Sequence, residues 1–370
     1  MYDVIVIGAG ASGAMCAIQA SSRGRRVLLL DSGLTPAKKL MVTGNGKCNL
    51  TNVHADSSKY NVNIDKYLNR FGVNNTIDFF ENLGLVVHVD DEGRVYPFSN
   101  SARSVIDVIN AKLKENGVEF LGDSSVAKVI KKPDSYAVLT ENEEFLTKSV
   151  VYSCGGLSSI GLLKTDTLYP SLCALKTIEN TKKLSGLRLS DVGVTARCGK
   201  KTMSDRGEVL FKDDGLSGIV VFNLSSLFAR AKKYDGTILI DLMPDNNLNE
   251  VEKLIQSRAK KFKQNLFVGW LCNEVAKFVM AQSGVKKLDD IGCKKLASTI
   301  KALTFNVCGY YDNAQVMSGG VELKKLDDNL QLKDQSGVYV IGEQCDVDGE
   351  CGGYNLQWAW TSGWIVGSAV

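Results

Sequence analysis

The chain has 370 residues, of which 44% are hydrophobic and 23% are charged, and its formal net charge is +3. This composition excludes extended disorder, and the length favours two domains. The small net charge, without a block of Lys or Arg, argues against a nucleic-acid partner, and no apolar run approaches the roughly 18 residues of a membrane span.

Cysteine and histidine usage excludes several kinds of site. The ten cysteines are scattered without a Cys-x-x-Cys pair, and His54 and His88 are the only histidines. We therefore expect buried, reduced thiols, no metal site and no histidine-based triad. The first apolar run follows Met1 directly, which leaves no room for a signal peptide, so we expect a cytoplasmic protein.

The first 31 residues give the clearest pattern in the chain. Apolar runs at 2–7 and 25–31 predict two buried parallel strands, with a helical pattern at 14–23 between them. A glycine-rich turn at 8–13 joins the first strand to the helix, and the second strand ends in Asp31. This order of elements predicts a dinucleotide-binding unit rather than a glycine-rich turn without a ligand.

The residues of this turn have separate physical roles in such a unit. Gly8 permits the tight turn, Gly10 lets a pyrophosphate approach the backbone, and Gly13 lets helix and strand pack closely. The helix N-terminus offers free N–H groups to the phosphates. Asp31 would accept hydrogen bonds from ribose hydroxyls, and the pattern does not distinguish FAD from NAD.

A polar segment and several regular elements follow. Residues 37–52 have little core-forming content, which is typical of a surface loop or of backbone that approaches a phosphate or a ring. The run Cys154-Gly155-Gly156 is either a second close approach to a cofactor or a tight turn. Between these two segments the periodicity predicts a helix at 64–85, a hairpin at 86–96, a helix at 102–116, a strand at 118–121 and a β-meander at 126–152.

The composition changes near Leu187, and residues 187–308 carry no dinucleotide signature. We expect an inserted domain that covers the cofactor and shapes a substrate cleft. Its strands are predicted at 192–196, 208–211, 218–223 and 237–241, and its helices at 248–263, 266–282 and 288–302.

The last part of the chain returns to the first domain. A buried strand at 337–343 ends in Gly342 and Glu343, and this carboxylate can accept hydrogen bonds from a ribityl chain. Gly353 precedes a helix at 354–366, so that the helix N-terminus can meet an electron-rich ring edge. We expect the tryptophans of this helix to pack in the core rather than to stack on a ligand.

Three segments together resemble a known family, the bacterial flavoproteins that include aminoacetone oxidase and a dehydro-bile-acid reductase. They are the turn at 8–13, the segment 39–52 (Lys-Leu-Met-Val-Thr-Gly-Asn-Gly-Lys-Cys-Asn-Leu-Thr-Asn) and the stretch 342–363 with its Gly-Glu-Gln-Cys start. The resemblance implies an α/β fold. A glutathione-reductase-like FAD-binding Rossmann domain (1–186 and 309–370) would be interrupted by a β-rich plus helical insert domain (187–308).

The resemblance also implies roles around one non-covalent FAD. Ala11 and Ser12 would hold the pyrophosphate, Val126 would pair its backbone with adenine, and Asn355 and Leu356 would bring helix N–H groups to the isoalloxazine. No catalytic residue and no metal ligand is assigned. The full set of expected cofactor-binding residues is Gly8, Gly10, Ala11, Ser12, Gly13, Asp31, Ser32, Lys39, Gly44, Cys48, Asn49, Leu50, Val126, Cys154, Gly155, Gly342, Glu343, Gly353, Asn355 and Leu356.

The expected activity is that of an FAD-dependent oxidoreductase acting on a small organic substrate, with NAD(P)H docking transiently as electron donor. One alternative is an amine oxidase of the aminoacetone oxidase type that uses O₂. Another is a flavin-binding protein with little turnover, because the Gly-rich segment that the family has after Gly156 is missing. Lys47 and Cys154 also depart from the family, which has Arg and Thr there. An NAD-dependent dehydrogenase is disfavoured by the 342–353 signature, and the oligomeric state stays open.

Overall fold

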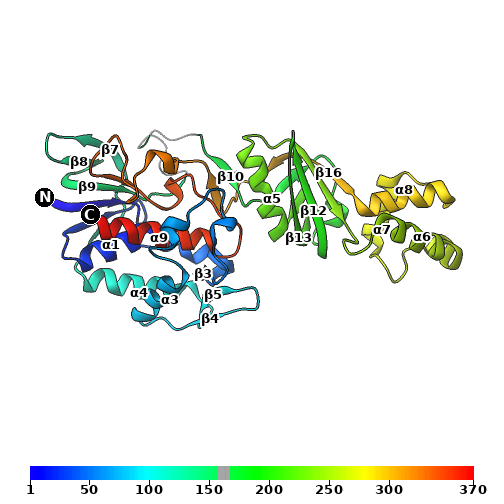
Figure 1. The fold of residues 1–370 in the computed structure, drawn as a ribbon, viewed down its shortest axis with the longest axis horizontal. Coiled ribbons are helices and arrows are strands. Elements are labelled where there is room, and N and C mark those ends of the chain that lie inside the picture. Colours follow the sequence, from blue (N-terminus) through cyan, green and yellow to red (C-terminus); the bar gives the residue numbers. More distant parts are fainter. Residues whose placement is uncertain (157–162, 164–166) are drawn as a thin grey trace. The chain divides into compact units, whose positions relative to one another are not determined.

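The computed structural model describes residues 1–156, 163 and 167–370, so the shortened segment after Gly156 lies outside the described residues. The chain divides into two compact units (Figure 1). The first contains Met1–Leu168 and Val316–Val370, and the second contains Tyr169–Gln315. The predicted borders at 187 and 308 fall inside the second unit, because β11 (Leu175–Thr177) pairs there with β16 (Leu303–Tyr310).

A seven-stranded sheet forms the centre of the first unit (Figure 1). Val4, Ile5 and Val6 of its strand β1 are fully buried, which explains the uninterrupted apolar run. An antiparallel meander extends the sheet from the first half of β9. The parallel strands, in spatial order, are β6 (Glu119–Leu121), β2 (Val27–Leu30), β1 (Tyr2–Ile7), β9 (Glu144–Tyr152) and β18 (Val338–Val340), and the meander adds β8 (Tyr136–Thr140) and β7 (Val126–Lys131).

Helices α1 (Ala11–Ser22) and α9 (Tyr354–Ala369) lie side by side in this unit (Figure 1). Two glycines of α9 permit the close approach. A Cβ at Gly363 would lie 2.4 Å from the carbonyl oxygen of Ser12, and one at Gly367 would lie 2.7 Å from that of Cys16. The first helix of the chain and this last one therefore pack backbone against backbone.

The single helix predicted at 64–85 is wrong, because the chain breaks it at Gly72. A Cβ at Gly72 would lie 2.8 Å from the carbonyl oxygen of Leu68, and Phe71 turns inward to stack on Trp364. The hairpin predicted at 86–96 forms as β4 (Val87–Val89) and β5 (Arg94–Pro97), and the helix predicted at 102–116 forms as α4 (Ala102–Glu115). The helices on the two sides of Gly72 are α2 (Asp65–Leu68) and α3 (Val73–Asn82). Further elements of this unit are η1 (Lys38–Gly46), β3 (Thr51–Asn52), η2 (Ser57–Lys59), β17 (Val316–Ser318), η6 (Leu323–Lys325) and η7 (Gly342–Gln344).

The second unit is built on a closed barrel. A helix, α5 (Ile219–Arg230), replaces the strand predicted at 218–223. Val220, Val221 and Leu224 are all buried, so the start of this helix has the continuous apolar run of a buried strand. The barrel order is β11, β14 (Gly215–Ser217), β13 (Lys201–Lys212), β12 (Arg188–Cys198), β15 (Gly236–Asp241) and β16, and β10 (Tyr169–Ser171) and η4 (Lys182–Leu184) precede β12 in the chain.

Three helices follow β15: α6 (Leu248–Phe262), α7 (Asn273–Ser283) and α8 (Asp290–Lys301). A capping box formed by Asn247 and Glu250 begins α6. The helix predicted at 266–282 begins only at 273, since η5 (Lys263–Asn265) and a run of turns precede it. None of the helices that the structure describes has the length and apolar character needed to cross a bilayer.

Candidate functional site

The glycine-rich turn connects β1 to α1, and its three glycines differ in their surroundings. A Cβ at Gly8 would lie 2.5 Å from the Cα of Cys154, and one at Gly13 would lie 1.9 Å from the carbonyl oxygen of Gly8. A Cβ at Gly10 would meet no described atom within 4 Å, and its φ of −69° suits any residue. Packing within the chain therefore requires Gly8 and Gly13 but leaves Gly10 unexplained.

Gly10 is also the N-cap of α1, and it has no side chain to cap the helix. The first N–H groups of α1, from Ala11 to Gly13, face the position where a phosphate binds in such turns. Ser12 is buried, and its Oγ would lie 2.4 Å from a Cβ at Gly342. The turn thus lies directly against the loop that follows β18.

Asp31 follows β2, and its carboxylate holds the turn in place. Its Oδ2 accepts a hydrogen bond from the Ala9 N–H at 2.6 Å, and its Oδ1 accepts one from the Gly33 N–H at 2.6 Å. A carboxylate has about four acceptor positions, so both oxygens retain capacity for ribose hydroxyls. Ser32, next to it, is exposed.

Val126 starts β7, where it pairs with Thr140 of β8. It is joined to the Asp31 region through the preceding loop, because the Ser124 N–H donates to the carbonyl oxygen of Asp31 at 2.9 Å. The predicted adenine contact therefore lies on the meander, two residues beyond a segment that touches Asp31.

The carboxyl ends of the parallel strands bring the later predicted residues to the same edge of the sheet. Cys154 and Gly155 follow β9, and Gly342 and Glu343 follow β18, the neighbour of β9. The Glu343 carboxylate is the centre of this group. Its Oε1 accepts from the Met317 N–H at 2.8 Å, and its Oε2 is 3.3 Å from the Nζ of Lys39.

The segment Cys48 to Asn52 is tied to α9 by a series of hydrogen bonds. The Trp360 indole donates to the carbonyl oxygen of Leu50 at 2.9 Å, and the Thr51 hydroxyl donates to Gln357 at 2.5 Å. The amide of Asn52 donates to the carbonyl oxygen of Gly352 at 3.1 Å. Two segments about 300 residues apart in sequence are therefore held together at the start of α9.

Asn49 lies at this junction with an unused polar atom. Its side chain is 7% exposed, and its Oδ1 has no hydrogen-bond partner among the described residues. A Cβ at Gly353, the N-cap of α9, would lie 2.8 Å from that oxygen. Gly44 packs on the same residue, since a Cβ there would lie 2.8 Å from the Asn49 nitrogen. Buried oxygens without partners are rare and indicate a missing ligand or water.

The side chain of Asn355 has a different role from the one its position suggests. Its Oδ1 accepts from the Gly349 N–H at 2.9 Å, and its Nδ2 donates to the Gly349 carbonyl at 2.9 Å. The amide thus holds the loop before α9. Only the backbone N–H groups of Asn355 and Leu356 remain for a ligand at the helix N-terminus.

The two cysteines predicted to line the site are neutral thiols. Burial raises the pKa of Cys48 to about 12 and that of Cys154 to about 11. A thiol with such a pKa is almost fully protonated at neutral pH and is a poor nucleophile. These cysteines can shape the site but are unsuited to thiolate chemistry.

Sequence reasoning missed several residues that support the site. Gln344 is buried, its Nε2 donates to the carbonyl oxygen of Gly155, and its Oε1 has no partner among the described residues. Ser362 accepts from the Gly342 N–H at 2.9 Å, and the Trp358 indole donates to the Gly342 carbonyl at 3.0 Å. No local signal marks Ser362 or Trp358, because their partner lies about one helix length earlier in the chain.

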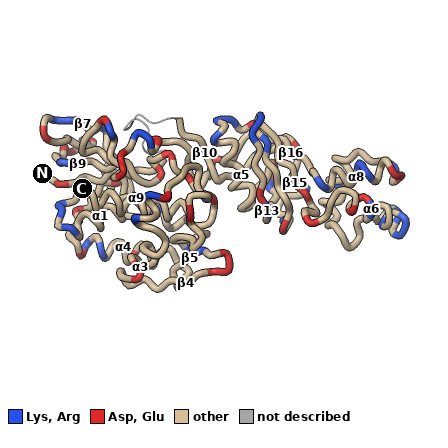
Figure 2. The backbone as a smooth tube through the Cα atoms, in the orientation of Figure 1, with Lys and Arg blue, Asp and Glu red and all other residues tan. Residues whose placement is uncertain are grey.

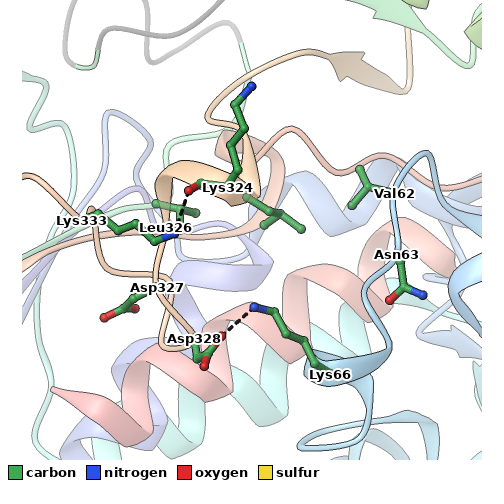
Figure 3. Close-up of a pocket in the computed structure, with 9 residues that line it drawn as sticks. Val62, Asn63, Lys66, Lys324, Leu326, Asp327, Asp328 and Lys333 are labelled. Atoms are coloured by element: carbon green, nitrogen blue, oxygen red, sulfur yellow. Dashed lines mark hydrogen bonds and ion pairs between the residues drawn. The ribbon is translucent and has the colours of Figure 1, made fainter.

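A hollow elsewhere in the first unit contains none of the predicted residues. Its volume is about 460 Å³, and Figure 3 shows it between Lys66 and the loop after η6. Its cations are already engaged: Lys66 pairs with Asp328 at 2.6 Å, and Lys333 donates to the Lys324 carbonyl at 2.9 Å. This hollow has no built set of free polar groups, and we do not assign a ligand to it.

Comparison with known proteins identifies relatives along the whole chain. The chain is 30% identical to the 3-dehydro-bile acid delta(4,6)-reductase of Clostridium scindens, over 100% of this chain and 99% of that protein. It is 29% identical to the ribosomal RNA dihydrouridine synthase of Escherichia coli, over 98% of this chain and 96% of that protein. Among solved structures, a flavocytochrome c3 fumarate reductase in an open conformation aligns with 99% of this chain and 77% of that chain, at 16% identity and a TM-score of 0.47.

The family assignment follows from a match over nearly the full length. The family described as the HI0933-like protein Rossmann domain matches residues 2–369. The strand–turn–helix at 2–22, the parallel sheet and the C-terminal helix all lie within that match. With its Rossmann-like α/β fold, this chain belongs to the HI0933-like Rossmann-domain family.

Proposed function

We propose that this chain is an FAD-dependent reductase that saturates a carbon–carbon double bond conjugated to a carbonyl group, with NAD(P)H as electron donor. The observation that carries the dinucleotide cofactor in this proposal is Gly10. It faces open space at an uncapped helix N-terminus, next to a turn in which the other two glycines are explained by packing. A pyrophosphate approaching the backbone is the physical reason for a glycine there.

The second half of the site supports a ring at the start of α9. The side-chain oxygens of Asn49 and Gln344, which have no hydrogen-bond partner among the described residues, and the N-terminus of α9 at Gly353 offer polar groups for the flavin half of FAD. Asp31 would hold the adenosine ribose, and Glu343 the region between the phosphates and the ring. The other residues assigned to FAD from the sequence are proposed in the same roles.

When bound, FAD supplies hydride transfer between NAD(P)H and the substrate. The chain would bind and orient both. The α9 N-terminus would favour negative charge on the adjacent ring edge, by about 0.3–1 kcal/mol, or about 2 kcal/mol where partly buried. We assign no side chain of the FAD site as proton donor to the substrate.

The names of two relatives support the class of substrate. A delta(4,6)-reductase of a 3-dehydro bile acid and a dihydrouridine synthase both act on a double bond conjugated to a carbonyl. For a simple enone substrate of this chain, we propose that a hydride from the flavin adds to the carbon remote from the carbonyl and that a proton adds to the carbon beside it. The shared chemistry favours a reductase over an O₂-using amine oxidase for this chain.

The absorption spectrum of the purified protein tests the cofactor, and anaerobic reduction tests the reaction. We expect a yellow protein that releases FAD on denaturation, whose flavin absorbance is bleached by NADH or NADPH. A conjugated enone added under argon should restore the absorbance. A colourless protein, or a flavin reduced by amines but not by NAD(P)H, would contradict the proposal.

A further inference from the structure

One face of the β4–β5 hairpin carries aromatic side chains that the FAD site does not explain. His88 of β4 pairs with Tyr96 of β5, and their rings stack with centroids 5.9 Å apart. The next pair on this face is Val86 and Phe98, which are 66% and 70% exposed. The solvent side of a small antiparallel sheet is normally polar, so this face offers an unusual area of apolar and aromatic surface.

Tyr96 joins this face to the segment that we propose to line the flavin. A Cβ at Gly44 would lie 3.4 Å from the Cε1 of Tyr96 and 2.8 Å from the Asn49 nitrogen. A Cβ at Gly353, the N-cap of α9, would lie 2.8 Å from the Asn49 Oδ1. A continuous series of three contacts therefore connects Tyr96 with the start of α9, and all four residues belong to the first unit.

The proposed reduction needs a proton donor, and the groups near this loop differ in their suitability. Cys48 is fully buried and cannot reach a substrate. The ammonium group of Lys39 is 3.3 Å from the Glu343 Oε2, so its charge is already paired. The ring of Tyr96 is partly exposed, and its hydroxyl forms no hydrogen bond with another residue that the structure describes. Tyr96 is therefore the acid with a proton to donate.

The charges around Tyr96 are suited to a phenol that loses its proton only during the reaction. Burial, with Asp90 and Glu92 adding to its effect and Arg94 opposing it, raises the pKa of Tyr96 above its ordinary value. The acidic tip of the hairpin also pairs with Arg94, at 2.7 Å and 2.9 Å (Figure 2). The Lys47 Nζ lies 5.9 Å from the Tyr96 ring centroid, and Lys47 forms no ion pair with a described residue. Its charge can stabilise a transient phenolate.

We propose that the Tyr96 hydroxyl donates the proton that completes reduction of the conjugated double bond. The inference rests on the proposed function and adds the acid to it. The carbon remote from the carbonyl receives a hydride with its two electrons, and the carbon beside the carbonyl receives the Tyr96 proton. The carbon–carbon π bond breaks, two C–H bonds form, and FAD is left oxidised. The Tyr96 phenolate then takes a proton from water, and NAD(P)H returns a hydride to FAD.

The test isolates the step that consumes this proton. The FAD of the intact protein is titrated to full reduction with dithionite under argon, so that NAD(P)H is not needed, and is mixed with 2-cyclohexen-1-one or 1-nitrocyclohexene. Hydride addition to the nitroalkene gives a nitronate, a stable anion that forms without proton transfer. We expect Tyr96→Phe to slow flavin reoxidation by the enone about 10²–10⁴-fold, the range of general acid catalysis, and reoxidation by the nitroalkene by less than about threefold.

The matched control is Tyr339→Phe, which removes the hydroxyl of a partly buried tyrosine on β18, away from this face, and should leave both rates unchanged. A binding measurement separates proton donation from substrate binding. The dissociation constant of the enone for the oxidised protein, read from the shift of the flavin spectrum, should agree among the variants, because Tyr96→Phe keeps the aromatic ring. Their FAD content should also agree.

Four results would overturn the inference. They are an unchanged enone rate in Tyr96→Phe, an equal loss of rate with both acceptors, a weaker enone affinity that accounts for the whole loss, and a larger loss in His88→Gln or Lys47→Gln than in Tyr96→Phe. If the enone fails to reoxidise the reduced flavin of the unaltered chain, the proposed function itself is wrong.

Discussion

Gly10 and Gly13 lie in the same turn, but a glycine is needed at the two positions for different physical reasons. Gly10→Ala adds a methyl group that meets no described atom within 4 Å, at an allowed φ, so thermal stability should stay close to that of the unaltered chain. FAD affinity should fall, because the methyl group would occupy the position of the phosphate. Gly13→Ala should instead destabilise the fold by about 1–3 kcal/mol, because its methyl would overlap the Gly8 carbonyl. Thermal unfolding and flavin fluorescence titration measure the two effects. Unchanged FAD affinity in Gly10→Ala would contradict the site.

Asp31→Ala should weaken FAD binding by about 1.5–3 kcal/mol, the scale of hydrogen bonds to a charged group. It should also lower stability, because the N–H groups of Ala9 and Gly33 lose their acceptor. Asp3→Ala is a suitable control, since Asp3 accepts from the Arg26 N–H at the opposite end of β1. If both variants bind FAD equally, Asp31 does not contact the cofactor.

At the scale of the element, α9 is tested by a change of charge at its first turn. Asn355→Asp adds a carboxylate beside the helix N-terminus, and we expect the midpoint potential of bound FAD to fall by roughly 20–40 mV, equivalent to about 1–2 kcal/mol for two electrons. It also removes the amide donor to the Gly349 carbonyl, so the unfolding temperature should fall.

A control for that loss is Asn61→Asp. Asn61 holds the same loop, because its Oδ1 accepts from the Asp348 N–H at 2.9 Å and its Nδ2 donates to the Asp346 carbonyl at 3.2 Å. This variant should lose stability without a change in potential. Equal shifts of potential in both variants would show that the effect comes from the loop and not from the start of α9.

Elements with strong local periodicity were predictable from the sequence. The strands at 2–7 and 25–31 and the helices at 102–116 and 248–263 have patterns that tertiary contacts reinforce. The prediction of a strand at 218–223 was wrong, because a helix that is buried on most sides has no polar face to reveal its period.

The sequence also places the glycine-rich turn and Glu343 at one edge of the sheet. It cannot show that Asn355 braces its own loop or that Gln344 reaches Gly155, because these contacts depend on how distant segments meet.

At the scale of the whole molecule, buried thiols predict a loss of stability at alkaline pH. Burial raises the pKa of Cys48 to about 12 and of Cys154 and Cys173 to about 11, so both units hold neutral thiols. The unfolded chain loses these protons first, near pH 8.5. The contribution of these thiols to the free energy of unfolding is therefore fully present below about pH 8.5. It decreases by up to about 1.4 kcal/mol per pH unit for each thiol as the pH rises towards the pKa values of the folded chain.

Urea unfolding at a series of pH values checks this dependence. The free energy of unfolding of Cys48→Ala should decline less steeply above pH 9 than that of the unaltered chain, because the variant has one buried thiol fewer to lose its proton on unfolding. Cys272→Ala, at an exposed position, should decline like the unaltered chain. Parallel declines in all three proteins would contradict the prediction.

The packing of α9 on α1 has a consequence for synthesis on the ribosome. The first unit needs residues from both Met1–Leu168 and Val316–Val370, with the second unit translated between them. Until β18 and α9 emerge, the second half of β9, at residues 150–152, lacks the strand that pairs with it, and the face of α1 that receives Gly363 and Gly367 lacks the helix that covers it. The nascent chain must therefore carry an open strand edge and an apolar helix face through most of translation, which is the stage at which a chaperone would be most needed.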